Sequence, residues 1–104
     1  MEYKLKYAPL YWQGLDGAIY YIANELDNPS AAQRMAEKAD KTIRLIEENP
    51  LLYPLYHDKA ISEKGYRYAI IGNYLLFYKV HENEKVIAIE AFVHGSQDLP
   101  NVII

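Results

Sequence analysis

Few side chains in this sequence have the chemistry that a catalytic site needs. His94 could act as a general acid or base, because the unperturbed pKa of histidine lies near neutrality. Arg67 could hold a phosphate through two hydrogen bonds from its planar guanidinium. Each has a structural alternative that the sequence leaves open. His94 could bond the tail that follows it, and Arg67 could pair with an internal carboxylate or with the C-terminus of a helix.

The other candidates for chemistry are weaker. His57 and His81 fall in predicted turns, where we expect solvated side chains, and no spacing of histidines suggests a metal site. The chain contains no cysteine, which excludes disulfides and thiolate ligands. It also contains no glycine-rich phosphate loop and no serine in a nucleophile motif. We therefore expect neither a metal nor a cofactor.

The composition indicates one globular domain over residues 1–104, since 51% of the residues are hydrophobic and no linker or repeat interrupts the chain. Lysine and arginine total 11 against 14 acidic residues, for a net charge of −3, and they form no basic cluster. A nucleic-acid-binding protein normally shows a basic face. The N-terminal stretch has no apolar core of signal-peptide length, and no apolar run is long enough to span a membrane. We expect a cytoplasmic protein without a membrane partner.

The elements that must position these side chains begin with a strand and two helices. Residues 2–8 alternate between apolar and charged side chains, which predicts a half-buried strand. Apolar residues recur at helical spacing over residues 10–26 and again over residues 30–48. Asn28 or Ser30 can cap the second helix. The short break between the two predicts an antiparallel helix hairpin.

Three strands are predicted in the second half of the chain, after a connection over residues 51–64 that shows no clear period. They cover residues 66–71, 74–80 and 86–93. Gly72 and Asn73 form a two-residue hairpin signal. The predicted fold class is α+β, with an N-terminal strand, an antiparallel helix hairpin and then a three-stranded antiparallel meander.

The predicted hairpin is apolar on both faces. A two-residue turn places Ile71 opposite Tyr74, and the strand period of two then assigns every other side chain to a face. One face carries Tyr66, Tyr68, Ile70, Leu75, Phe77 and Lys79, and the other carries Arg67, Ala69, Ile71, Tyr74, Leu76 and Tyr78. The helices can cover only one of them. Tyrosine, present 11 times, suits strands and cores as well as interfaces, and the sequence does not separate these roles.

Three stretches in this order resemble motifs of the RelE/ParE superfamily of bacterial type II toxin–antitoxin toxins. The first is the helix restart and ending, "NPSAA" and "IRLIEENP", and the second is the hairpin "GYRYAIIGNYLLFYKV". The third is the strand end "FVHGSQD", similar to the superfamily's His-Gly-Arg-Arg-Asp. The resemblance covers nearly the whole chain and implies a small twisted sheet packed on the helix hairpin.

The resemblance implies one of two activities, ribosome-dependent cleavage of mRNA or inhibition of DNA gyrase, silenced in both cases by an antitoxin. As a metal-independent nuclease, the chain would use Arg67, His94 and Tyr78 as catalytic residues. The basic residues of the nuclease pattern are missing, however. Their positions are occupied by Tyr68, Ile70, Leu75, Ser96 and Gln97.

We therefore expect a toxin that acts by binding a protein, with gyrase as the first candidate target. An mRNA endonuclease is the alternative, and a member that only binds an antitoxin is a further one. By the superfamily pattern, the face that begins with Arg67 packs on the helices. The face with Tyr66, Tyr68, Ile70, Leu75, Phe77 and Lys79 would then be open, and we expect it to bind the antitoxin or the target, or to mediate self-association.

Overall fold

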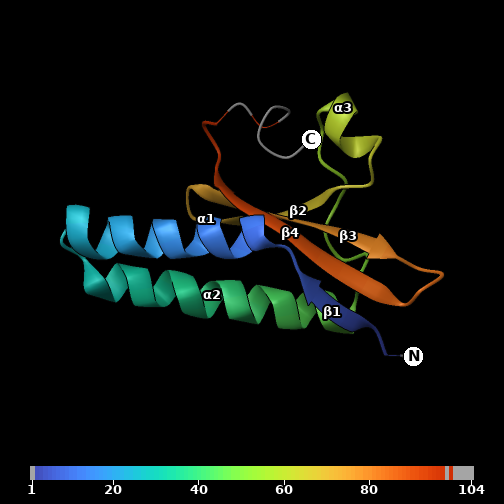
Figure 1. The fold of residues 1–104 in the computed structure, drawn as a ribbon, viewed down its shortest axis with the longest axis horizontal. Helices are drawn as coiled ribbons and strands as arrows, with labels where there is room; N and C mark the ends of the chain where they lie inside the picture. Colours follow the sequence, from blue (N-terminus) through green and yellow to red (C-terminus); the bar gives the residue numbers. More distant parts are fainter. Residues whose placement is uncertain (1, 98, 100–104) are drawn as a thin grey trace.

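The computed structural model of the chain describes residues 2–97 and residue 99 (Figure 1). The fold is α+β: one strand, a pair of long helices and three further strands that complete a four-stranded sheet. The elements in chain order are β1 (Lys4–Tyr7), α1 (Pro9–Tyr20), the π-helix η1 (Tyr21–Glu25), α2 (Pro29–Glu48), α3 (Lys59–Ser62), β2 (Arg67–Ile71), β3 (Tyr74–His81) and β4 (Val86–His94).

The sheet has the strand order β1-β4-β3-β2, so the N-terminal strand lies at one edge and β2 at the other. β1 runs parallel to β4, while β2, β3 and β4 form the predicted antiparallel meander. Ile71 pairs with Tyr74 across the Gly72-Asn73 turn, which confirms the predicted register. The register between β3 and β4 shifts once, between Phe77 and Tyr78. β4 has one extra residue there, which forms a β-bulge.

The predicted first helix is continuous through η1, but its last turn is a π-helix rather than an α-helix. Asn28 caps α2, since its side-chain oxygen accepts a hydrogen bond from the backbone N–H of Ala31 at 3.1 Å. Asp27, just before this cap, has a φ of +50°, a conformation that few residues other than glycine adopt. The two helices run side by side as the predicted antiparallel hairpin and cover one face of the sheet (Figure 1).

A glycine permits the close contact between α1 and the sheet. A Cβ atom added at Gly14 would lie 1.8 Å from the backbone oxygen of Phe92 on β4. No side chain fits at that distance, so glycine at this position allows the helix to lie directly on the strand. Gly17, one turn later, has no atom within 4 Å of the same added group. Close packing on the sheet therefore requires glycine at position 14 but not at position 17.

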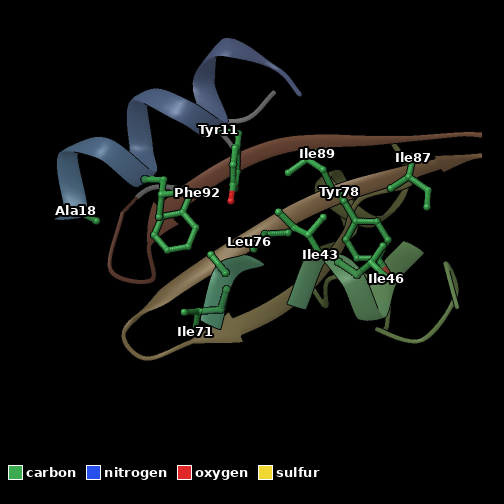
Figure 2. Packing of buried hydrophobic residues seen from close by; sticks show 12 residues of the cluster. Tyr11, Ala18, Ile43, Ile46, Ile71, Leu76, Tyr78, Ile87, Ile89 and Phe92 are labelled. Carbon is green, nitrogen blue, oxygen red and sulfur yellow. The ribbon is translucent and has the colours of Figure 1, made fainter. Parts of the chain in front are cut away.

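The main core lies between the helix hairpin and the sheet (Figure 2). The predicted helix-facing strand residues Ile71, Leu76 and Tyr78 are fully buried there, which confirms that face of the hairpin. The helices and β4 contribute Tyr11, Leu15, Ala18, Ala39, Ile43, Ile46, Ile87, Ile89 and Phe92.

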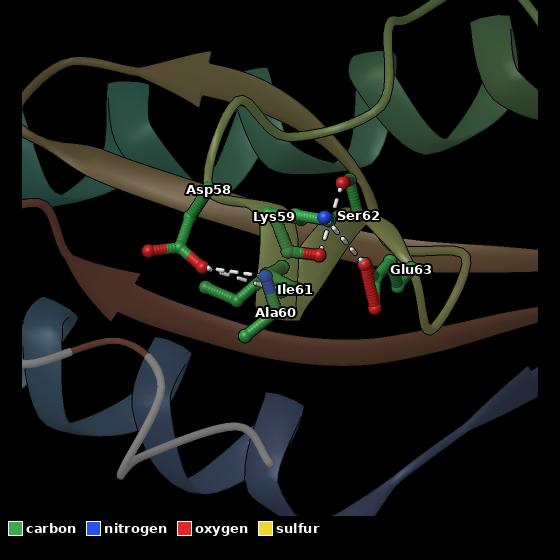
Figure 3. Close-up of polar contacts among 6 residues, drawn as sticks. All are labelled: Asp58, Lys59, Ala60, Ile61, Ser62 and Glu63. Atoms are coloured by element: carbon green, nitrogen blue, oxygen red, sulfur yellow. Dashed lines mark hydrogen bonds and ion pairs between the residues drawn. The ribbon is translucent and has the colours of Figure 1, made fainter.

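A second core lies on the opposite face of the sheet, under the connection that precedes β2. Its buried members are Ile61, Tyr66, Phe77, Ala91, Val93 and Leu99. Ile61 belongs to α3, a single helical turn that the sequence did not predict. Figure 3 shows how Asp58 caps this turn: its Oδ1 accepts hydrogen bonds from the backbone N–H groups of Ala60 at 2.9 Å and of Ile61 at 3.4 Å.

Candidate functional site

Two of the three side chains predicted for nuclease chemistry hold the connection after α2 against the sheet. The guanidinium of Arg67 donates a hydrogen bond to the backbone oxygen of Tyr53 at 2.7 Å. The hydroxyl of Tyr78 donates one to the backbone oxygen of Pro50 at 2.8 Å. Arg67 and Tyr78 are cross-strand partners in the β2–β3 ladder. The structural alternative that the sequence left open for Arg67, an internal partner, is therefore the observed one, although that partner is a backbone carbonyl.

Burial governs the ionisation of Tyr78, whose side chain is fully buried. Desolvation raises the pKa of this phenol above its ordinary value, and the backbone of Tyr53 and the charge of Arg67 oppose the shift only in part. The hydroxyl is protonated at neutral pH and already donates to Pro50. In this arrangement, Tyr78 has no free proton or lone pair directed at solvent for a reaction.

The third candidate, His94, ends β4 and organises the turn that follows. Its Nδ1 accepts a hydrogen bond from the backbone N–H of Ser96 at 3.1 Å and lies 2.7 Å from the Ser96 hydroxyl. Its own backbone N–H donates to the side-chain oxygen of Gln97 at 2.9 Å. These bonds correspond to the structural alternative for His94, a histidine that bonds the tail. Because Nδ1 accepts, a neutral ring would carry its proton on Nε2.

The structure does not bring the three candidates together. His94 lies opposite Tyr74 on β3, whereas Arg67 lies opposite Tyr78 on the same strand. Tyr74 and Tyr78 are four residues apart, which corresponds to about 13 Å along a strand. Each of the three side chains is bonded locally instead, Arg67 and Tyr78 to the connection and His94 to its own turn. A catalytic role for Arg67, His94 and Tyr78 acting as one site has no geometric support.

The face that we expected to be open is covered over Tyr66 and Phe77, and for these two residues the expectation is wrong. Tyr66 and Phe77 are only 6% and 0% exposed, in the second core. Tyr56 from the connection packs edge-on against Phe77, with ring centroids 5.1 Å apart. The physical reason is that burying such rings against Tyr56, Ile61 and Leu99 removes a large apolar area from water. A partner cannot reach Tyr66 or Phe77 in this conformation.

The other predicted binding residues keep part of their surface. Tyr68, Leu75 and Lys79 are half-buried, and the Nζ of Lys79 lies 4.4 Å from the centroid of the Tyr66 ring, in cation–π contact. Only Ile70 is strongly exposed, at 62%. The predicted surface for antitoxin, target or self-association is therefore reduced to the margin of this face near β2.

Sequence reasoning missed a groove at the turn end of the helix hairpin. It has a volume of about 430 Å³, and the exposed side chains of Tyr21 and Leu26 form one wall. Burial, with a contribution from Tyr21, raises the pKa of Tyr74, which also lines the groove. The run "YYIANEL" could have indicated exposed apolar residues here, but helical periodicity assigned Leu26 to the core. The remaining lining residues are Ile22, Asn28, Ala31, Met35, Gly72, Asn73 and His94.

The described residues contain neither a metal cluster nor a helix fit to span a membrane. Among residues 2–97 and 99, no group of three histidine, aspartate or glutamate side chains is arranged to hold a metal ion. No helix within those residues combines the length and the apolar character that crossing a bilayer requires. The groove and the margin beside Ile70 remain as candidate sites for contact with another protein.

Comparison with known proteins identifies a toxin family. The family model described as "ParE toxin of type II toxin-antitoxin system, parDE" matches residues 5–99. Among solved structures, the chain is similar to a chain of the toxin–antitoxin complex RelBE2 from Mycobacterium tuberculosis, with a TM-score of 0.58 and 16% sequence identity. That match covers 90% of this chain and 99% of the RelBE2 chain, and it supports the fold. A comparison with curated proteins gives no match.

Proposed function

The chain belongs to the ParE toxin family of type II toxin–antitoxin systems, and we propose that it acts by binding a protein target, with DNA gyrase as the first candidate. A cognate antitoxin holds it inactive. The similar fold of a chain in the RelBE2 toxin–antitoxin complex supports an antitoxin partner. The proposed location is the cytoplasm, where both partners would meet the toxin.

The observation that carries this proposal is the engagement of the candidate catalytic side chains in structural bonds. Arg67 and Tyr78 bond backbone carbonyls of the connection, and His94 bonds the turn after β4 about 13 Å away along the sheet. RNA cleavage without a metal needs a base, an acid and charge stabilisation at one phosphate. These side chains do not converge on one point, whereas binding a protein requires no such convergence.

The surface chemistry also favours a protein target. The positions where the nuclease pattern has basic residues carry tyrosine, isoleucine, leucine, serine and glutamine, in a chain of net charge −3. Loss of a single charge contact to a transition state typically costs about 3–4 kcal/mol of barrier. Several such contacts are missing, so we expect RNA cleavage to be far too slow to arrest growth.

A supercoiling assay with purified gyrase tests the target. We expect the toxin to inhibit supercoiling at micromolar concentration, and equimolar antitoxin to restore it. Because Leu26 lines the groove and is 55% exposed, Leu26→Lys should weaken inhibition while leaving the fold intact. Full supercoiling at the highest toxin concentration would remove gyrase as the target.

Expression without the antitoxin separates this proposal from the two alternatives. We expect growth arrest without new cuts in ribosome-bound transcripts. Cuts that disappear in both His94→Ala and Arg67→Lys, with thermal unfolding unchanged, would establish the nuclease instead. Healthy growth with abundant folded protein would indicate a member that binds an antitoxin but no longer poisons.

A further inference from the structure

The outer edge of β2 is open for part of its length. The register of β2 with β3 determines which of its backbone N–H and C=O groups point toward this edge. Ile71 pairs with Tyr74 next to a two-residue turn, so the odd-numbered residues of β2 bond to β3 and the even-numbered ones point outward. Two observed bonds agree with this: the N–H of Tyr68 donates to the oxygen of Pro54 at 3.1 Å, and the oxygen of Tyr66 accepts from the N–H of Tyr56 at 3.0 Å.

Proline ends this short ladder. A complete antiparallel pair between Tyr68 and Pro54 would also have a bond from Pro54 to the oxygen of Tyr68, but proline has no N–H to donate. In the part of the chain that the structure describes, no strand pairs with β2 beyond this point on its outer side. Ile70 therefore presents both its N–H and its carbonyl oxygen outward.

We propose that this edge pairs with the same edge of a second copy of the chain, in an antiparallel dimer whose two-fold axis passes between the two Ile70 residues. In an antiparallel ladder, two residues that are directly opposite can exchange both of their backbone hydrogen bonds. Ile70 has both groups open, while the N–H of Tyr68 is already used. Two-fold symmetry makes identical residues partners, so pairing Ile70 with Ile70 satisfies both copies at once.

The apolar side chains at this edge are exposed to solvent, and a second copy of the chain would cover them. Ile70 is 62% exposed, and Leu55, which bridges to Arg67 at the same edge, is 47% exposed. A hollow of about 270 Å³ beside Ile70, lined also by Tyr53, Pro54, Tyr68 and Ala69, can receive an apolar side chain from the other copy.

Charge distinguishes this edge from the other edge of the sheet. The segments "LLYPLY" and "YAII" that form the β2 edge contain no charged residue, so two copies with net charge −3 meet here without close like charges. At the opposite edge, β1 exposes Lys4 and Lys6. Exposed lysines are a common device that prevents edge-to-edge pairing, and β2 lacks it.

The proposed contact between the two copies is small, in the class that buries less than about 1,200 Å² and forms transiently. The dimer should therefore depend strongly on protein concentration.

Disulfide capture tests this geometry directly, because the chain has no cysteine of its own. Bonded partners in an antiparallel pair lie about 5.5 Å apart at Cα, within the range that a disulfide spans. We expect Ile70→Cys to form a covalent dimer under mild oxidation, and Leu26→Cys, 55% exposed but outside the β2 edge, to form one at least about tenfold more slowly. Equal rates for the two variants would overturn the proposal.

Sedimentation equilibrium supplies a measurement without cysteine. The wild type should pass from monomer to dimer as concentration rises, and Ile70→Lys should weaken the dimer at least about tenfold by placing two cations in opposition. Leu26→Lys, the matched control, should leave the dimer unchanged. A wild type that stays monomeric at every concentration, or a dimer weakened only by Leu26→Lys, would contradict the pairing. Neither result depends on whether gyrase is the target.

Discussion

The two faces of the sheet are closed by different kinds of chain. On one face, α1 and α2 place long periodic stripes of apolar residues over the strands (Figure 2). On the other, the cover is an irregular connection with one helical turn, α3, together with Leu99. Both covers exclude solvent completely from at least one aromatic ring, Tyr78 on the first face and Phe77 on the second. A short irregular segment can therefore close a sheet face if polar bonds fix its path.

Those bonds connect the two faces. The connection begins under the hydroxyl of Tyr78 and the guanidinium of Arg67, both on the helix-covered side. It then passes the β2 edge, where its Tyr56 N–H donates to the oxygen of Tyr66 and its Pro54 oxygen accepts from the N–H of Tyr68, and it reaches α3 over the second core. Two of the three residues that the superfamily resemblance assigned to catalysis, Arg67 and Tyr78, are in this chain the anchors of the second cover.

The largest expected effect tests whether the second face is a true core. Phe77→Ala should lower the free energy of unfolding by about 3–5 kcal/mol, the usual cost of deleting a buried phenylalanine side chain. Chemical denaturation would measure it. Ile70→Ala, on the same face but 62% exposed, should change stability by less than about 0.5 kcal/mol. Similar small values for both would mean that the second cover is open in solution.

The next effect tests the contact of the first cover with the sheet. Gly14→Ala should cost about 3 kcal/mol, because the new methyl group would overlap the backbone oxygen of Phe92 and displace α1. Gly17→Ala is the matched control: it adds the same group in open space and should stabilise the helix by about 0.5–1 kcal/mol. Thermal unfolding of the two variants should shift in opposite directions. Equal shifts would contradict the close approach at Gly14.

Alkaline pH should weaken the first cover through its buried phenols. Burial is the largest cause that raises the pKa of both Tyr11 and Tyr78, whereas an unfolded tyrosine titrates near about 10. The folded state then binds its protons more tightly, so stability is complete below pH 10 and falls as pH rises further.

Denaturation midpoints measured from neutral to alkaline pH would show this fall. Tyr78→Phe should lose about 1–3 kcal/mol at neutral pH, since the Pro50 carbonyl loses its donor. The same variant should show a shallower fall above pH 10. A pH dependence identical to that of the wild type would exclude Tyr78 as a contributor.

The smallest effect concerns the cap of α3. Asp58→Ala should cost about 1 kcal/mol, because two backbone N–H groups lose their acceptor (Figure 3). Amide exchange would show the loss concentrated in residues 59–63, while Asp58→Asn should retain most of the stability. A uniform loss over the helix hairpin would show instead that the two covers unfold as one unit.

Much of the fold could be predicted because it depends on neighbours close in sequence. Helical periodicity identified α1 and α2, and Gly72 with Asn73 set the hairpin register that pairs Ile71 with Tyr74. The parallel pairing of β1 with β4 and the helical turn α3 could not be predicted in this way. The first joins distant parts of the chain, and the second is too short to show a period.

The candidate site shows the same limit. The sequence identified Arg67, Tyr78 and His94 as the side chains with possible chemistry and marked the missing basic residues. Only the tertiary structure decided that two of them hold a connection, that the third lies at the other end of β3 and that Tyr66 and Phe77 are buried.

The sequence by itself determined which residues form each strand and the two long helices, because alternation, helical spacing and turn residues act over a few positions. The tertiary structure decided what covers the second face and which edge stays open. Those outcomes depend on contacts between residues far apart, such as Tyr56 with Phe77 and Pro54 with Tyr68. The free energy of such contacts comes from burial and from unpaired backbone groups, and neither has a periodic signature in the chain.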